Sequence, residues 1–253
     1  MIVSWFSCGA PSAVASMLAI KKYGRSVVVA NTPIKEEHAD NERFLRECQE
    51  WLGVEIQKIT NPKYPSNSCQ EVWVKRKYMS GTSGAVCTYE LKKQARYLFE
   101  SQHDIQYHVF GFTAEEAIRA ERFRLTERPN ALTPLIDKGY TRGDCIRILS
   151  EVGIEPPAMY REGFPNNNCI GCVKATSPTY WNHVRKLYPD IFLDRAKLSR
   201  ELGVRLARVK GKRIFLDELK PTDKGRALKS LNFDCGLFCE EYTEIRQALE
   251  EIE

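Results

Sequence analysis

Residues 2–31 read IVSWF-SCGAPS-AVASMLAIKKYGR-SVVVA-N, and this stretch decides the fold. The apolar run at 2–6 predicts a buried strand, the turn-forming residues 7–12 predict a loop, and residues 13–23 predict a helix. Ser26–Ala30 is rich in valine without polar alternation, which is typical of a strand buried on both faces of a parallel sheet. The stretch therefore predicts the first strand, helix and second strand of an α/β domain.

The alternation of strands and helices continues along the chain. Further helices are expected at residues 42–52, near 71–78, at 89–101 and at 141–152, with strands at 54–59 and 107–110. This order predicts a mostly parallel sheet with flanking helices in a Rossmann-type arrangement. Beyond about Pro156 the pattern changes to helices at 177–188 and 191–202, a hairpin around Gly211-Lys212 and a charged terminal helix. We therefore expect an α/β domain at 1–155 and a small cysteine-bearing C-terminal region at 156–253.

The composition is that of an ordinary globular protein. The 253 residues are 43% hydrophobic and 28% charged, and the net charge is +5. No run reaches the roughly 18–20 apolar residues of a membrane span, and the first residues lack the pattern of a signal peptide. These features predict a cytoplasmic protein with no membrane partner. The positive net charge is compatible with a nucleotide or nucleic acid as partner.

The loop at residues 7–12 carries the residue types of a phosphate site. A Ser/Gly loop between a strand and a helix presents hydroxyls, backbone N–H groups and a helix N-terminus to an anion. Ser7 and Ser12 supply the hydroxyls, Gly9 allows a ligand to approach the backbone, and Cys8 lies between them. In open α/β sheets such loops follow the carboxyl ends of strands, where ligands bind. The alternative is a capped helix start with Ser7 or Ser12 as the N-cap.

Nine cysteines in a chain expected to be cytoplasmic point to metal binding or catalysis rather than to disulfides. Cys169-x-x-Cys172 has the spacing of two ligands of one metal, and Cys235-x-x-x-Cys239 is a second pair. Together the two pairs match a four-cysteine zinc site. The second pair would otherwise be two small buried residues one turn apart on a helix. The cysteines without a partner at metal spacing are interpreted as core residues: Cys48, Cys69 and Cys145.

Several segments, in order, resemble the adenine-nucleotide α-hydrolase (PP-loop) superfamily. The S-C-G-A-P-S loop and its helix, followed by VVVANTPIKEEHADNERF at 27–44, are similar to its nucleotide-binding start. The later segments look most like the adenylyl and phosphoadenylyl sulfate (APS/PAPS) reductases, which have C-C-x-x-R-K, P-L-I-D-W, P-L-Y-D-x-G-Y with C-x-x-C, and E-C-G-L-H. The corresponding segments here are Cys87–Lys93, Pro134–Ile136, Pro157–Phe164 with Cys169–Cys172, and Asp234–Phe238.

The resemblance implies an adenine nucleotide as ligand, which is APS, PAPS or ATP. Pro11 stands where the PP-loop ATP pyrophosphatases have an aspartate, which favours the reductases. The arginine-rich reductase segment G-x-R-x-x-x-S-x-x-R corresponds to residues 111–119, with Thr113 in place of the first arginine and two carboxylates inside the segment. The residues expected to contact the nucleotide are Ser7, Cys8, Gly9, Ser12, Asn31, Gly111, Arg119 and Arg122.

For the cysteines, the resemblance implies a four-iron four-sulfur cluster held by Cys87, Cys169 and Cys172, with zinc as the alternative metal. Val86 replaces the first cysteine of the reductases' double-cysteine motif, so the fourth ligand must come from elsewhere, and Cys239 is the expected candidate. Cys235 corresponds to the reductase nucleophile. It is interpreted as the nucleophile or, alternatively, as the fourth ligand of the cluster.

The expected activity is reduction of a sulfonucleotide to sulfite. The Cys235 thiolate would attack the sulfur of the nucleotide and form a thiosulfonate, which a thiol reductant such as thioredoxin would release. One alternative is an ATP-dependent enzyme that adenylates or thiolates a nucleobase or RNA. Another is a nucleotide-binding or nucleic-acid-binding module with a structural zinc held by four cysteines.

Overall fold

The computed structural model describes residues 1–81, 84–167 and 169–231, and the chain divides into two compact units. The expected boundary at residues 155 and 156 differs from this division, because the first unit continues to Glu162 and the second includes two earlier segments. Unit 1 consists of Met1–Pro33, Ala39–Thr60 and Ala95–Glu162, and unit 2 consists of Ile34–His38, Asn61–Gln94 and the described residues from Gly163 onward.

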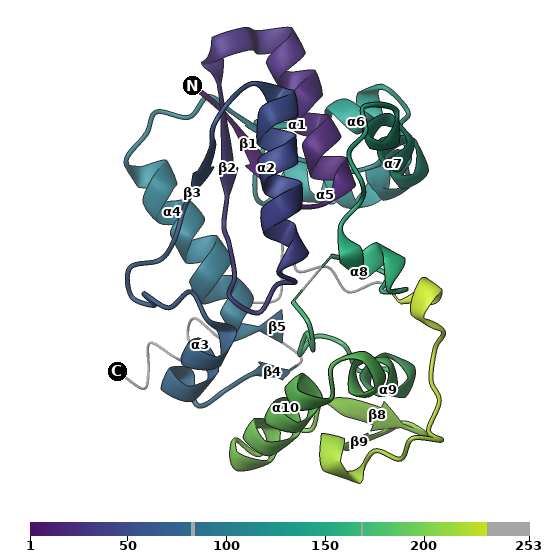
Figure 1. Cartoon of the computed structure of the whole chain (residues 1–253). Helices are drawn as coiled ribbons and strands as arrows, with labels where there is room; N and C mark the ends of the chain where they lie inside the picture. The colour runs from purple at the N-terminus through teal and green to yellow at the C-terminus, as the bar shows by residue number, and fades with distance from the viewer. Residues whose placement is uncertain (82–83, 168, 232–253) are drawn as a thin grey trace. The chain divides into compact units, whose positions relative to one another are not determined.

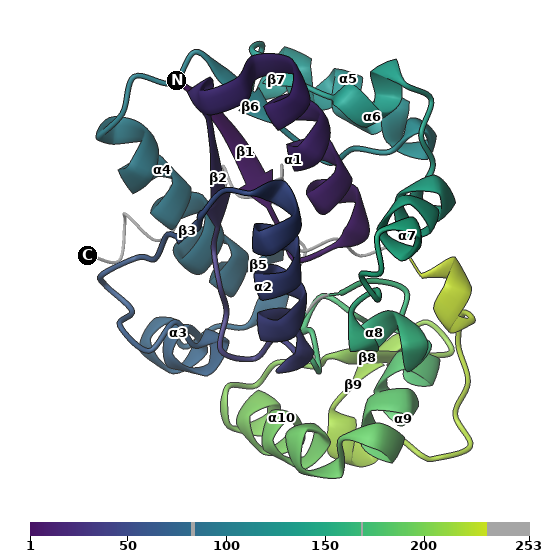
Figure 2. The ribbon, with the colours of Figure 1, turned by 45° about the horizontal axis from the view of Figure 1, so that its top comes forward.

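Unit 1 is built on a parallel sheet of five strands (Figures 1 and 2). They are β1 (Ile2–Phe6), β2 (Val27–Asn31), β3 (Ile56–Lys58), β6 (Tyr107–Val109) and β7 (Ala131–Leu132). Their order is β3-β2-β1-β6-β7, so β1 is central and pairs in parallel with β2 and β6. The predicted α/β class with a parallel, Rossmann-like sheet is confirmed.

Helices cover both faces of this sheet. The helices α1 (Ala10–Tyr23) and α2 (Asp40–Leu52) run side by side over one face (Figures 1 and 2), and Phe44 of α2 stacks on Phe6 with 6.1 Å between ring centroids. On the other face, Phe99 of α4 (Gln94–Ser101) meets Trp5 edge to face at 6.1 Å. The remaining helices are α5 (Ala117–Thr126), α6 (Pro134–Asp137), α7 (Arg142–Glu151) and α8 (Ala158–Arg161), with 3-10 turns η1 (Gly24–Ser26) and η3 (Ala114–Glu116).

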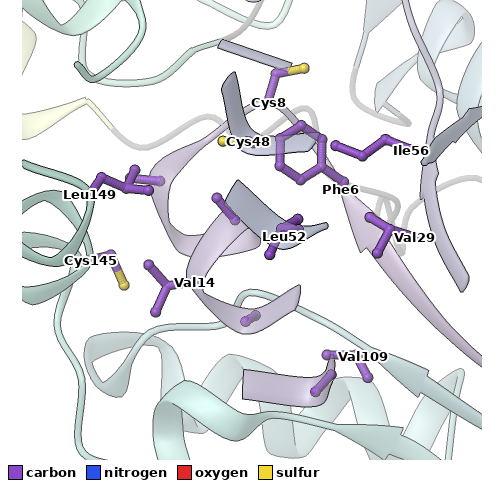
Figure 3. Packing of buried hydrophobic residues seen from close by; sticks show 14 of the residues in the cluster. Phe6, Cys8, Val14, Val29, Cys48, Leu52, Ile56, Val109, Cys145 and Leu149 are labelled. Carbon is purple, nitrogen blue, oxygen red and sulfur yellow. The ribbon is translucent and has the colours of Figure 1, made fainter. Parts of the chain in front are cut away.

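Residues of the sheet, α1, α2 and α7 form the hydrophobic core of unit 1 (Figure 3). Cys48 of α2 and Cys145 of α7 lie within this core, and both side chains are fully buried. Burial raises the pKa of each thiol to about 12, so both stay protonated at neutral pH. The prediction that Cys48 and Cys145 are core residues is confirmed.

Unit 2 combines helices with two short antiparallel pairs of strands. The predicted hairpin is formed by β8 (Ala207–Val209) and β9 (Lys212–Ile214), and both turn residues, Lys210 and Gly211, have positive φ, as a type I′ hairpin turn requires. Across the described ranges, the helices are too short or too polar to cross a membrane. The elements of unit 2 are α3 (Cys69–Arg76), β4 (Ser80–Gly81), β5 (Gly84–Ala85), the π-helix η2 (Thr88–Lys93), α9 (Pro178–Leu187), α10 (Pro189–Glu201), β8 (Ala207–Val209), β9 (Lys212–Ile214), η4 (Leu216–Glu218) and η5 (Leu228–Ser230).

Candidate functional site

The loop between β1 and α1 is organised by the hydroxyl of Ser12. Ser12 Oγ accepts hydrogen bonds from Ser7 N at 3.0 Å, from Ser7 Oγ at 3.2 Å and from Gly9 N at 3.4 Å, and it donates to Gly9 O at 2.8 Å. Cys8 adopts a positive φ of 55°, and its side chain is buried in the hydrophobic core. Because this side chain is buried, the predicted contact with a nucleotide would have to come from the backbone of Cys8. Ser7 is the exposed residue of this loop.

Gly111, just beyond β6, lies directly against the start of α1. A Cβ atom at this position would lie 2.7 Å from Ser12 N and 2.8 Å from the carbonyl carbon of Pro11. Only glycine allows the two backbone segments to approach this closely. The predicted site residue Gly111 therefore adjoins the predicted loop and has a packing role there.

Asn31 ends β2 next to the last residue of β1. Its Nδ2 donates to Phe6 O at 2.8 Å and lies 3.7 Å from Cys8 Sγ. Its Oδ1 is buried, and no hydrogen-bond donor among the described residues reaches it. A buried acceptor without a donor costs about 1–3 kcal/mol. Asn31 thus offers an acceptor at the carboxyl edge of the sheet, where ligands of open α/β sheets bind.

The two arginines predicted at the anionic end lie on α5. Arg119 Nη1 pairs with Glu116 Oε1 at 2.7 Å, and the guanidinium lies 5.5 Å from the ring centroid of Phe112. Arg122 is exposed one turn further along. Glu116 therefore offsets much of the charge that Arg119 would bring to an anion, and the carboxylates inside this segment have a structural role.

Tyr160 of α8 is a neighbour of the loop that the sequence analysis did not single out. A Cβ atom at Gly9 would lie 3.5 Å from the Tyr160 hydroxyl oxygen, which places this hydroxyl over the loop. Tyr160 belongs to the P-A-M-Y-R-E-G-F segment, one of the segments that resemble the reductases, so it could have been selected from that motif. Tyr160 is thus a further polar group beside Gly9.

The second group of predicted site residues lies in unit 2. Cys87, Cys169 and Cys172 are all buried in this unit. Cys169 Sγ lies 4.0 Å from the Sγ of Cys69, a residue interpreted from sequence as plain core. The Cys172 backbone N–H donates to the Tyr180 hydroxyl at 2.8 Å. Cys69 is buried, as expected for a core residue, but it also lies beside a thiol 100 residues away, of which the spacing along the chain gave no sign.

Cys87 is in contact with the same thiol. A hydrogen bond from Cys69 lowers the pKa of Cys87, and Lys174 and Trp73 act in the same direction against the effect of burial. Cys87 directly precedes the π-helix η2. Turns of π-helix are rare in proteins overall, and those that occur are often at functional sites. In that turn, Lys92 Nζ pairs with Glu37 Oε1 at 3.3 Å. Cys69 therefore links Cys87 and Cys169.

The structure thus places the predicted site residues in two groups, one in each unit. Cys235 and Cys239 lie outside the described residues, so their predicted roles stay predictions. Within the described part of the chain, no three His, Cys, Asp or Glu side chains already have the arrangement of a site for one metal ion. No protein-family model matches this chain, and a search of curated proteins returns no significant match.

Proposed function

We propose that this chain is a sulfonucleotide-reductase-like oxidoreductase of adenine-nucleotide α-hydrolase fold that binds APS or PAPS at the Ser7–Ser12 loop. The observation that carries the proposal is the buried Asn31 Oδ1, which has no donor among the described residues and lies beside this loop. A hydroxyl or amino group of a nucleotide would supply the missing donor and recover about 1–3 kcal/mol.

The anionic end of the nucleotide is assigned to the loop rather than to α5. The first-turn amides of an α-helix have no intrahelical acceptor, and the helix dipole favours an anion there. Ser7 is exposed at this end, and Tyr160 adds a hydroxyl next to Gly9. Since Arg119 is already paired with Glu116, its contribution to anion binding is expected to be small.

The reductive part of the proposal rests on the cysteines. Cys87, Cys169 and Cys172 are buried thiols in one unit, and thiolates are the ligands that iron–sulfur clusters take. We assign these three residues to such a cluster. When bound, it would supply redox and electrostatic chemistry at a potential set by burial and by hydrogen bonds to its sulfurs.

The chemical step is assigned to Cys235. Its thiolate attacks the sulfur of the sulfonucleotide, the S–O bond to the nucleotide breaks, and AMP (or its 3′-phosphate, from PAPS) leaves, so that the enzyme carries a cysteine thiosulfonate. A thiolate of thioredoxin or a similar dithiol then attacks the cysteine sulfur, and sulfite leaves. The second thiol of the reductant resolves the mixed disulfide, so the dithiol supplies the two electrons.

The test is anaerobic incubation of the full chain with APS or PAPS and reduced thioredoxin, followed by measurement of sulfite. We expect sulfite formation that Cys235→Ser abolishes and that the matched core variant Cys145→Ala retains. A metal-loaded protein that forms no sulfite from either nucleotide contradicts the proposal. Release of AMP or pyrophosphate from ATP that depends on added RNA would instead support the adenylating alternative.

A further inference from the structure

The cysteine group of unit 2 contains one more thiol than the resemblance implies. Cys69 begins α3, and its Sγ lies 4.0 Å from that of Cys169 and within hydrogen-bonding reach of Cys87. Cys172 is three residues after Cys169 in the same C-x-x-C segment. The four side chains are between 3% and 7% exposed. Three separate segments of the chain thus place four buried thiols in one unit.

Glu36 fixes two of these segments. Its carboxylate accepts hydrogen bonds from Ser68 Oγ at 2.5 Å, from Cys69 N at 2.8 Å and from Gln70 N at 3.1 Å. Its backbone carbonyl accepts from Ile170 N, inside the C-x-x-C segment, at 2.9 Å. One residue therefore anchors both the start of α3 and the loop that carries Cys169, as expected for a preformed site rather than for incidental core packing.

Two buried N–H donors in the same unit have no acceptor among the described residues. Trp73, one turn after Cys69, is 2% exposed, and no acceptor in the described ranges meets hydrogen-bond geometry with its indole N–H. That N–H nevertheless lies close enough to Cys87 to affect its thiol.

Arg195 of α10 is 4% exposed, and its Nε likewise has no acceptor among the described residues. Its guanidinium stacks on Trp73 at 4.6 Å, and its stem borders Gly171 of the C-x-x-C segment. Buried donors and a buried cation are costly without an anionic partner. A centre ligated by four thiolates is anionic, and N–H groups that donate to its sulfurs are a usual feature of iron–sulfur sites.

We propose that Cys69 is the fourth thiolate ligand of a metal centre whose other ligands are Cys87, Cys169 and Cys172, with Trp73 and Arg195 beside it as hydrogen-bond donors. In a four-iron cluster each thiolate binds a different iron, so the four sulfurs need not converge on one point. The inference rests on the metal centre of the proposed function but not on the sulfite-forming activity. It leaves Cys239 without a ligand role and Cys235 available for chemistry.

The experiment compares Cys69→Ala with Cys48→Ala and Cys239→Ala after anaerobic purification of the full chain. Iron, acid-labile sulfide and zinc are quantified, and visible absorbance is recorded. We expect Cys69→Ala to fall below half of the wild-type metal content, while the two other variants retain it. Wild-type metal and absorbance in Cys69→Ala, loss of metal in Cys239→Ala, or a Cys69–Cys169 disulfide in the purified protein would each overturn the assignment.

A second variant and a separate readout guard against simple misfolding. Cys69→Ser conserves size and can still bind a metal through oxygen, so it should retain part of the metal with an altered visible spectrum. Far-UV circular dichroism and nucleotide binding by unit 1 should match those of the wild type in both Cys69 variants. If Cys69→Ser has the wild-type spectrum at full metal content, Cys69 is not a ligand. Sulfite formation by the wild-type protein is measured separately. A wild-type protein that has an intact metal centre but forms no sulfite refutes only the reductase proposal.

Discussion

Gly111→Ala is the substitution that most directly tests how the nucleotide loop is supported. The added Cβ would lie 2.7 Å from Ser12 N, 2.8 Å from Pro11 C and 2.9 Å from Ser12 Cα. All three atoms belong to the backbone at the start of α1, so no side-chain rotation relieves the contact. Ordinary van der Waals contact begins near 3.4 Å, so the backbone at Gly111 and the start of α1 must move apart by about 0.7 Å to bring the 2.7 Å distance to that value.

Overpacking a well-packed core costs typically about 1–3 kcal/mol, and we expect a loss at the upper end, about 3 kcal/mol, because backbone must move. For a protein of this size that corresponds to a fall in Tm of roughly 6–12 °C. The same displacement of Ser12 should weaken binding of AMP or APS. Urea unfolding followed by circular dichroism measures the first effect, and calorimetric titration measures the second.

Gly143→Ala is the matched control. Gly143 lies in the first turn of α7, where a Cβ would meet only Thr141 Oγ1, at 3.6 Å, and alanine favours the helix. Its free energy of unfolding should stay within about 0.5 kcal/mol of the wild type or rise. A Gly111→Ala protein that is as stable as Gly143→Ala and binds nucleotide normally would refute the proposed close approach of Gly111 to α1.

Three further predictions concern single side chains. Burial, together with Arg128 and Arg96, lowers the pKa of His108 from 6.5 to about 4, so the unfolded chain takes up the proton at a higher pH than the folded chain does. The contribution of His108 to stability should therefore be complete above pH 6.5 and fall by up to about 3 kcal/mol between pH 6.5 and 4. His108→Gln should reduce this pH dependence in unfolding experiments. Asn31→Ala should raise the Kd for AMP or APS about tenfold in calorimetry, and an unchanged Kd would remove Asn31 from the site. Trp73→Phe removes an N–H donor to the sulfurs, so it should keep the metal but lower its midpoint potential in a redox titration by roughly 20–40 mV, equivalent to about 0.5–1 kcal/mol. An unchanged potential would mean that the indole N–H does not face the sulfurs.

The parallel sheet could be predicted because its signals are local. Ile2–Phe6 and Val27–Asn31 are apolar runs without alternation, and both became strands buried between two layers of helices. The loop between β1 and α1 followed from Ser7, Gly9 and Ser12 in the same way. These inferences needed no knowledge of which distant segments meet.

The cysteine group could be predicted only in part, because its members come from distant segments. Cys169 and Cys172 share a C-x-x-C spacing, whereas Cys69 meets Cys169 across 100 residues. The division into two compact units also depends on distant segments, since Ile34–His38 and Asn61–Gln94 join a unit formed mainly by later residues. The pairing of Arg119 with Glu116, by contrast, depends only on a local i, i+3 spacing, but the sequence analysis expected no helix at α5 and so did not predict it.

The proposed iron–sulfur cluster is held by buried thiolates of unit 2. Quantification of iron and acid-labile sulfide in anaerobically purified wild-type protein, together with its visible spectrum, tests it most directly. We expect about four irons and four sulfides per chain and a brown protein with broad absorbance. One zinc per chain without iron or sulfide, or a protein that contains no metal at all, would contradict it.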